Sequence, residues 1–140
     1  MSSSYGISLQ VRHPVADPND IARGLGLPAK RSWKMGESRS TPRGTALAGR
    51  YDTTYCAFDL GAGDDRELAE RLRVVVAALL LKQDFFRGLR ATGASLNLFI
   101  TWTVGERGEM FDCALLSDLA SLGIDLGIEP VIAFPLRTCG

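Results

Sequence analysis

The sequence predicts one α+β domain with a mainly antiparallel sheet of five or six strands and helices packed chiefly on one face. Segments in which apolar and polar residues alternate recur along the chain and are typical of half-buried strands. Other segments carry apolar residues three and four positions apart, which indicates helices that face a core. The 140 residues fit a single domain, 1–140, without linker or internal repeat. A ferredoxin-like arrangement is the nearest simple architecture.

The first third should form a strand, a tight turn, a short helix and a short edge strand. Residues 5–11 alternate in polarity, and His13-Pro14 ends the strand, with His13 acting as a hydrogen-bonding group there. Asp17-Pro18 indicates a helix N-cap followed by the first helical residue, and Gly26 indicates the helix end. Residues 29–34 are expected to pair as the edge strand.

A long irregular loop is expected next, followed by a strand. Gly36, Pro42, Gly44 and Gly49 punctuate the loop. Strand character resumes over residues 51–60, where one face should carry Tyr51, Thr53, Tyr55 and Ala57, and the other Thr54, Cys56, Phe58 and Leu60.

A long helix with a broken end should follow, capped by Asp64 or Asp65. Glu67 and Arg71 have a favourable spacing on its solvent side. The break is expected near 82–84, before a short helix that contains Phe85, Phe86 and Leu89. The core-facing stripe of the long helix is Leu68, Leu72, Val75, Val76, Leu79 and Leu80.

The last third should contain a strand over 96–102, a hairpin, a helix and a final strand. Residues 105–108 are typical of a hairpin loop that returns the chain through Met110 and Phe111. Asp112 and Gly123 should bound the helix, and Pro130 places the final strand at an edge or a bulge. The helix residues expected to face inward are Leu115, Leu116, Leu119 and Leu122.

Charge is distributed unevenly, although the net charge is zero. Segment 30–50 carries six basic residues against one acid, Glu37, and segment 106–129 carries six acids against Arg107. Zero net charge indicates no general attraction to nucleic acid or to an anionic membrane. The two segments either face each other or meet partners of opposite sign. The six basic residues are Lys30, Arg31, Lys34, Arg39, Arg43 and Arg50.

Residues 26–37, which read Gly-Leu-Pro-Ala-Lys-Arg-Ser-Trp-Lys-Met-Gly-Glu, resemble the signature of the bacterial domain-of-unknown-function family 4279 (DUF4279). Arg39, Pro42, Gly44, Tyr51 and the strand around Tyr55 continue the resemblance, and the leucine-rich segment 115–126 is similar to the family's C-terminal part. It covers nearly the whole chain and implies a small bacterial cytosolic protein. The family supplies no established activity to carry over.

Cysteine usage and hydropathy favour a cytoplasmic protein. Cys56, Cys113 and Cys139 are odd in number and far apart, which suits a reducing compartment. The first residues lack the basic and apolar regions of a signal peptide, and the longest apolar run, 74–81, is too short to span a membrane.

No catalytic residue, metal site or cofactor is expected. His13 is the only histidine, so a zinc site would need it together with three scattered cysteines. A Cys–His nucleophile pair with Cys56 or Cys113 has no local signature, and both are interpreted as small buried apolar residues. The glycines form no phosphate-binding motif. The paired acids at 64–65 and at 106 and 109 are explained by helix capping and turns.

The basic segment is therefore the candidate site. The first hypothesis is a non-enzymatic, immunity- or regulator-like protein-binding module whose basic loop docks an acidic protein. One alternative is single-stranded nucleic-acid binding, in which Trp33 and Tyr51 would stack on bases. Others are an enzyme of unrecognised type and a solvated loop that only keeps the protein soluble, with Trp33 closing the edge of the core. The candidate partner-binding residues are Arg31, Trp33, Lys34, Arg39, Arg43, Arg50 and Tyr51.

Overall fold

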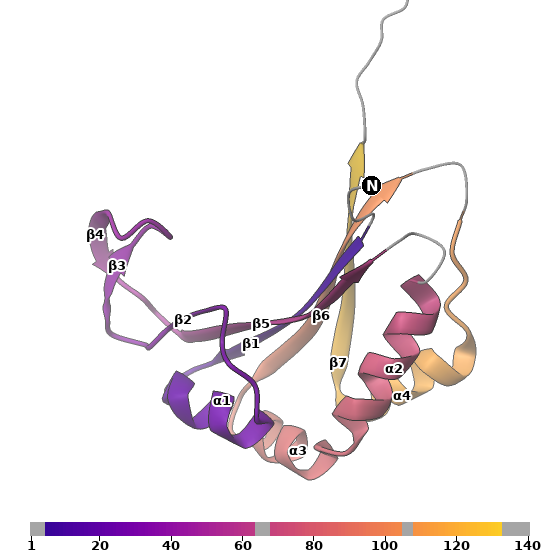
Figure 1. Ribbon diagram of the computed structural model, residues 1–140. Coiled ribbons are helices and arrows are strands. Elements are labelled where there is room, and N and C mark those ends of the chain that lie inside the picture. Colours follow the sequence, from indigo (N-terminus) through magenta and orange to yellow (C-terminus); the bar gives the residue numbers. More distant parts are fainter. Residues whose placement is uncertain (1–4, 64–67, 105–107, 133–140) are drawn as a thin grey trace, which may run out of the picture.

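The computed structural model describes residues 5–63, 68–104 and 108–132. They form an α+β domain in which four helices pack against one face of a five-stranded sheet, with a separate two-stranded hairpin (Figure 1). The elements are β1 (Tyr5–His13), α1 (Pro18–Leu25), β2 (Arg31–Trp33), β3 (Ser38–Ser40), β4 (Ala46–Arg50), β5 (Thr54–Gly63), α2 (Leu68–Leu80), α3 (Gln83–Ala91), β6 (Ser95–Val104), α4 (Cys113–Leu122) and β7 (Ile124–Ile132).

The strand order in the large sheet is β2-β5-β1-β6-β7. β1 pairs antiparallel with both β5 and β6, and β2 pairs antiparallel with β5. Through β6 the chain follows the β-α-β-β-α-β order of ferredoxin-like folds, with the β3–β4 hairpin inserted between the second and third strands of that order. α4 then leads to β7, which adds a parallel edge strand beside β6. The predicted fold class is confirmed.

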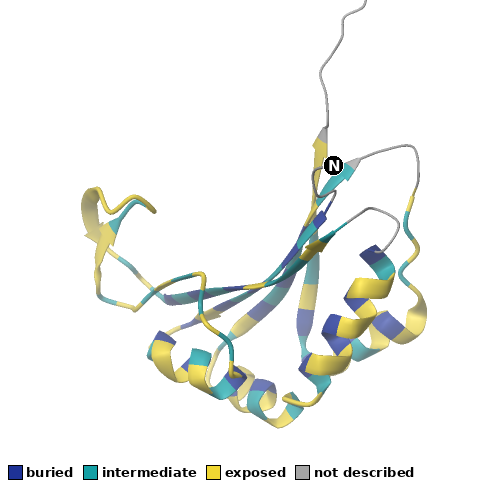
Figure 2. Ribbon diagram, in the orientation of Figure 1, coloured by how far each residue is buried: buried dark blue, intermediate teal, exposed yellow. Residues whose placement is uncertain are grey.

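The core lies between the sheet and the helices, because one face of each central strand is apolar. In β1 the alternating residues Tyr5, Ile7, Leu9 and Val11 are buried, while their neighbours are more exposed (Figure 2). The helices supply the facing layer, including Leu72 and Phe86, which are fully buried. Each large side chain of this kind stabilises the fold by about 1.5–3 kcal/mol through removal from water.

The predicted helix ends at α1 and α4 are confirmed. The Asp17 carboxylate accepts a hydrogen bond from the Asn19 N–H at 2.8 Å, and the Asp112 carboxylate accepts one from the Leu115 N–H at 2.9 Å. Gly26 and Gly123 both have a φ of 71°, the left-handed conformation that ends a helix and favours glycine. The predicted caps of α2, Asp64 and Asp65, lie outside the described ranges, and so does Glu67 of the predicted Glu67–Arg71 pair.

The prediction of an irregular loop over residues 36–50 is wrong. This segment contains the hairpin β3–β4, which projects beyond the β2 edge and away from the helices (Figure 1). All residues of β4 are exposed, so the hairpin adds little to the core. β5 begins at Thr54, three residues later than predicted, and Tyr51 lies between the hairpin and this strand.

Two predictions in the last third are also wrong. Met110 and Phe111 form no strand; residues 108–112 lead directly into α4, so β7 returns parallel to β6. Residues 105–107 of the predicted hairpin loop lie outside the described ranges. Leu116 is 45% exposed, because a position adjacent to buried Leu115 is rotated about 100° around the helix. The edge position of β7, with Pro130 in it, agrees with prediction.

Candidate functional site

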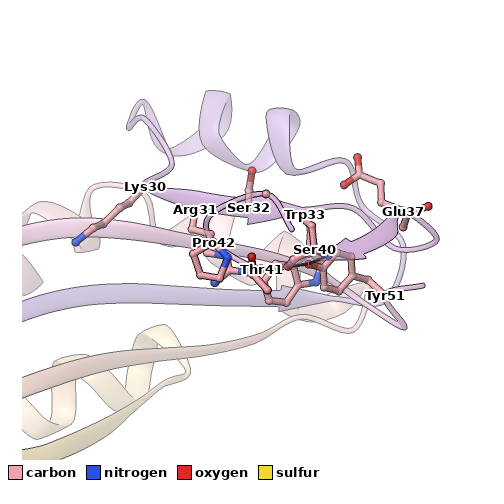
Figure 3. A pocket seen from close by; sticks show the side chains of 11 residues that line it. Lys30, Arg31, Ser32, Trp33, Glu37, Ser40, Thr41, Pro42 and Tyr51 are labelled. Atoms are coloured by element: carbon pink, nitrogen blue, oxygen red, sulfur yellow. Dashed lines mark hydrogen bonds between the residues drawn. The ribbon is translucent and has the colours of Figure 1, made fainter. Parts of the chain in front are cut away.

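A groove of about 550 Å³ lies between β2 and the β3–β4 hairpin (Figure 3). We call it the hairpin groove. Its lining combines two cations, one acid, two aromatic side chains and four serine or threonine hydroxyls. The lining residues are Lys30, Arg31, Ser32, Trp33, Glu37, Ser38, Ser40, Thr41, Pro42, Gly44 and Tyr51.

Three aromatic side chains, Trp33, Tyr51 and Tyr55, form a stack beside the groove. The Trp33 and Tyr51 rings are 4.2 Å apart and inclined by 9°, and Trp33 and Tyr55 are 4.6 Å apart and inclined by 27°. Trp33 and Tyr55 are paired directly across β2 and β5, which places them on the same face of the sheet. That face is opposite the one occupied by buried Cys56. Contacts of this kind stabilise by about 0.5–1.5 kcal/mol per pair beyond burial.

Two guanidinium groups lie over the rings of this stack. The Arg31 guanidinium carbon is 5.0 Å from the Trp33 ring centroid, and that of Arg12 is 4.6 Å from the Tyr55 centroid. Both distances are within the range of cation–π attraction. The stack therefore holds Arg31 at the wall of the groove.

Tyr51 fastens the hairpin to the stack. Its hydroxyl donates to the Ser40 carbonyl at 2.9 Å and accepts from the Ser40 N–H at 3.1 Å. The N–H bond from Ser40 is the main cause of a lowered Tyr51 pKa, with smaller contributions from Arg31; partial burial acts in the opposite direction. The Gly36 N–H donates to the Tyr51 carbonyl, and the Tyr51 N–H donates to the Glu37 carbonyl, each at 2.9 Å.

Three further residues of the predicted site, outside the stack, also have contacts within the chain. Arg39 donates to the Ala48 carbonyl at 3.0 Å, and Arg50 donates to the Gly36 carbonyl at 2.7 Å. The Lys34 ammonium lies 3.8 Å from the Asp17 carboxylate. Bonds to carbonyls leave the arginine charges unneutralised, so in the described part of the chain Lys34 is the only one of these three that an acid offsets.

Lys30 and Arg43 are exposed, and within the described ranges their charged groups have no ion pair or hydrogen bond. Lys30 lines the groove, and Arg43 lies in the turn between β3 and β4. The structure thus brings Arg31, Trp33 and Tyr51 of the predicted set together at one groove. Lys34, Arg39, Arg43 and Arg50 do not line it.

Sequence reasoning missed Lys30 as a site residue and missed the hydroxyl groups contributed by Ser32, Ser38, Ser40 and Thr41. The cluster Ser38-Arg39-Ser40-Thr41 within a basic segment was the available signal, because hydroxyl and cationic groups together suit an anionic ligand. A second missed residue is Arg12, which reaches the stack from β1.

His13 forms no pair with Cys56 or Cys113, the two cysteines in the described part of the chain. Burial, and secondarily the charge of Asp17, raise the pKa of the Cys56 thiol to about 11, so this group is not a thiolate at neutral pH. Both His13 ring nitrogens are engaged elsewhere: Nδ1 accepts from the N–H groups of Val15 and Ala16, and Nε2 lies 2.8 Å from the Thr92 hydroxyl. Cys113 is exposed at the start of α4, so its predicted burial is wrong.

A smaller hollow of about 190 Å³ between α2 and α4 contains Asp112 and Asp118. The bond from the Leu115 N–H, and then the Arg73 guanidinium at 3.3 Å, lower the Asp112 pKa. This acid is therefore ionised at neutral pH and is used as a helix cap.

No helix within residues 5–63, 68–104 and 108–132 is long and apolar enough to cross a membrane. The same residues contain no group of three His, Cys, Asp or Glu side chains that could hold a metal ion. No protein-family model matches the chain, and no curated protein and no solved structure matches it significantly. The resemblance to family 4279 therefore stays a prediction.

Proposed function

We propose that this chain is a non-enzymatic protein-binding module that docks an acidic surface of another protein against the hairpin groove. The observation that supports it best is the gathering of cations around an aromatic stack, where Arg12 and Arg31 have no acidic partner among the described residues. Such a module would neutralise or regulate its partner, as an immunity-type or regulatory protein does. The proposal includes the resemblance to family 4279 and the cytoplasmic location expected from the sequence.

Electrostatics support this proposal. Segment 30–50 carries six basic residues against Glu37, and Lys34–Asp17 is the one ion pair that it makes among the described residues. Arg39 and Arg50 are held by carbonyl groups and present their charge in a fixed place. A positive surface of this kind speeds association with an acidic partner and selects against basic ones.

The aromatic contacts favour a protein partner over single-stranded nucleic acid. Base stacking needs free aromatic faces. The Trp33 ring already contacts Tyr51, Tyr55 and the Arg31 guanidinium, and the Tyr55 ring also contacts Arg12. Because these contacts occupy the Trp33 and Tyr55 rings, the cations are the main groups that remain for a ligand to bind.

Charge reversal of Lys30 and Arg43 tests the proposal. The double variant Lys30→Glu/Arg43→Glu should weaken binding of the partner, isolated by affinity capture from native lysate and then purified, by roughly tenfold or more. Its unfolding midpoint should match that of the wild type, because neither charged group has a contact within the described residues. Arg39 is avoided because its bond to Ala48 supports the hairpin.

A matched control is Arg71→Glu/Lys82→Glu, which makes the same change in charge on exposed residues of the helix layer whose charged groups have no hydrogen bond or ion pair among the described residues. Binding by this control should stay within about twofold of the wild type. Equal partner affinity in the wild type and the Lys30/Arg43 variant would refute the proposed docking surface. Capture of single-stranded nucleic acid with a steep salt dependence would favour the alternative.

A further inference from the structure

We infer that Arg31 is the anchor of the hairpin groove and that it holds one carboxylate side chain of an acidic peptide segment through paired N–H donors. This inference rests on the proposed function and names the ligand chemistry of the same site. The proposed function attributes binding of the acidic partner to the whole basic surface, whereas this inference attributes the specific contact with a carboxylate to Arg31.

Arg31 is fixed before any ligand arrives. Its guanidinium lies over the Trp33 ring, and one of its nitrogens, Nη2, donates to the Ser40 carbonyl at 3.4 Å. A guanidinium carries five N–H donors, so most of them remain available for a planar carboxylate. Because Arg31 is half-buried and stacked, less side-chain entropy is lost on binding than for a free arginine.

The charge of the groove suits a single carboxylate. Among its lining side chains Lys30 and Arg31 are cationic and Glu37 is anionic, which leaves a net charge of +1. In Figure 3, Lys30 lies at one end of the row of lining side chains and Glu37 at the other, with Arg31 and Pro42 between them. A phosphate dianion would be incompletely neutralised here and would meet Glu37, whereas a carboxylate matches the net charge.

The remaining lining groups suit a peptide. The exposed hydroxyls of Ser32 and Ser38 can donate to carboxylate or peptide carbonyl oxygens. Pro42 and the edge of the aromatic stack provide apolar surface for the stem of a glutamate side chain. The volume of about 550 Å³ is within the usual range of ligand sites.

The experiment uses Trp33 fluorescence and hexaglutamate as the probe. Trp33 and Trp102 are the only tryptophans, so a Trp102→Phe parent makes the signal specific. The Trp102 Nε1 is buried without a hydrogen-bond partner in the described part of the chain, so phenylalanine should be accepted there. Hexaglutamate should change Trp33 fluorescence saturably, and hexaglutamine should not.

Two arginine-to-lysine substitutions in this parent distinguish binding through paired N–H donors from binding through positive charge alone. Arg31→Lys keeps the positive charge but loses the planar fork, and should weaken hexaglutamate binding roughly tenfold. Arg71→Lys should stay within about twofold, because Arg71 lies on α2 in the helix layer and does not line the groove. Equal affinity in Arg31→Lys and the parent would overturn the inference, as would equal binding of hexaglutamine. Displacement of hexaglutamate by an equal or lower concentration of inorganic phosphate would replace the carboxylate assignment with a phosphate site.

A second readout separates a binding contact from a structural one. A bound carboxylate beside Arg31 should raise the pH at which Tyr51 ionises, because its negative charge opposes the phenolate. Absorbance titration in the presence and absence of hexaglutamate measures this change, and Tyr51→Phe should remove it. If Arg31→Lys binds the captured protein normally while Lys30→Glu/Arg43→Glu does not, the Arg31 inference fails and the proposed function stands. If both variants bind normally, both fail.

Discussion

His13 is the only histidine of the chain, and it joins the end of β1 to two other segments. Its Nδ1 accepts from the Val15 and Ala16 N–H groups at 3.1 and 2.9 Å, and its Nε2 lies 2.8 Å from the Thr92 hydroxyl at the end of α3. The side chain is 4% exposed, so water does not replace these partners readily. The hydrogen-bonding role predicted from its position before Pro14 agrees with this geometry.

Replacing His13 by alanine should therefore destabilise the protein. The two backbone N–H groups bonded to Nδ1 would lose their acceptor, and an unsatisfied buried donor costs about 1–3 kcal/mol. Chemical denaturation of His13→Ala measures the loss. Thr92→Val removes the Nε2 contact and the hydroxyl's bonds to the Gly88 and Leu89 carbonyls but keeps both bonds to Nδ1, and should cost less. A His13→Ala free energy of unfolding equal to that of the wild type would contradict this structural role.

At the scale of elements, helix ends were predictable because their causes are local. Asp17 and Asp112 each accept a backbone N–H two or three residues ahead, and Gly26 and Gly123 supply left-handed conformations. The β3–β4 hairpin was not predictable in the same way. Its strands are three and five residues long and almost wholly exposed, so no alternation of buried residues marks them. The hairpin is held instead by Tyr51 and two arginines that bond to distant carbonyls.

The cap of α4 gives an element-scale prediction with a pH dependence. Asp112→Ala should cost about 1 kcal/mol, because the Leu115 N–H loses its acceptor. The pKa of Asp112 is lowered on folding, so its charge stabilises the protein above the unfolded pKa, about 4, and this contribution is lost as pH falls through the folded pKa. Denaturation at several pH values should show the difference between wild type and Asp112→Ala shrinking below pH 4.

Asp112→Asn is the matched control for this prediction. Asparagine keeps an oxygen that can accept the Leu115 N–H, so most of the stability at neutral pH should remain. Its carboxamide does not titrate, so the pH-dependent part should disappear. A gap between wild type and Asp112→Ala that stays constant from pH 7 to pH 3 would show that the charge of Asp112 contributes nothing.

At the scale of the whole molecule, the described parts of the basic and acidic segments do not face each other. Strand β2 contains Arg31 of the basic segment, and β7 contains Asp125 and Glu129 of the acidic segment. These two strands form opposite edges of the five-stranded sheet. No ion pair joins the two segments among the residues that the structure describes. Of the two possibilities that the sequence left open, the positive segment is therefore free to meet a partner of opposite sign.

The sheet and its buried face followed from sequence patterns, whereas the groove did not. The alternation in β1 and the apolar stripe in α2 are caused by burial of one face, and each pattern is visible within a single segment of the sequence. The hairpin groove depends on pairing between Trp33 and Tyr55 and on the return of Tyr51 to Ser40, both of which join residues far apart in the sequence. The parallel direction of β7 likewise depends on α4, which connects it to β6. The apolar residues Met110 and Phe111 suggested a hairpin strand there instead.

The most direct test of the central claim is amide hydrogen exchange of the protein with and without the purified partner. The account predicts that binding slows exchange over residues 30–33 and 38–51, because those segments form the hairpin groove. Amides of α2 and α3 should exchange at unchanged rates, since they belong to the opposite layer. Protection confined to the helices, with the hairpin exchanging as fast in the complex as in the free protein, would contradict the account.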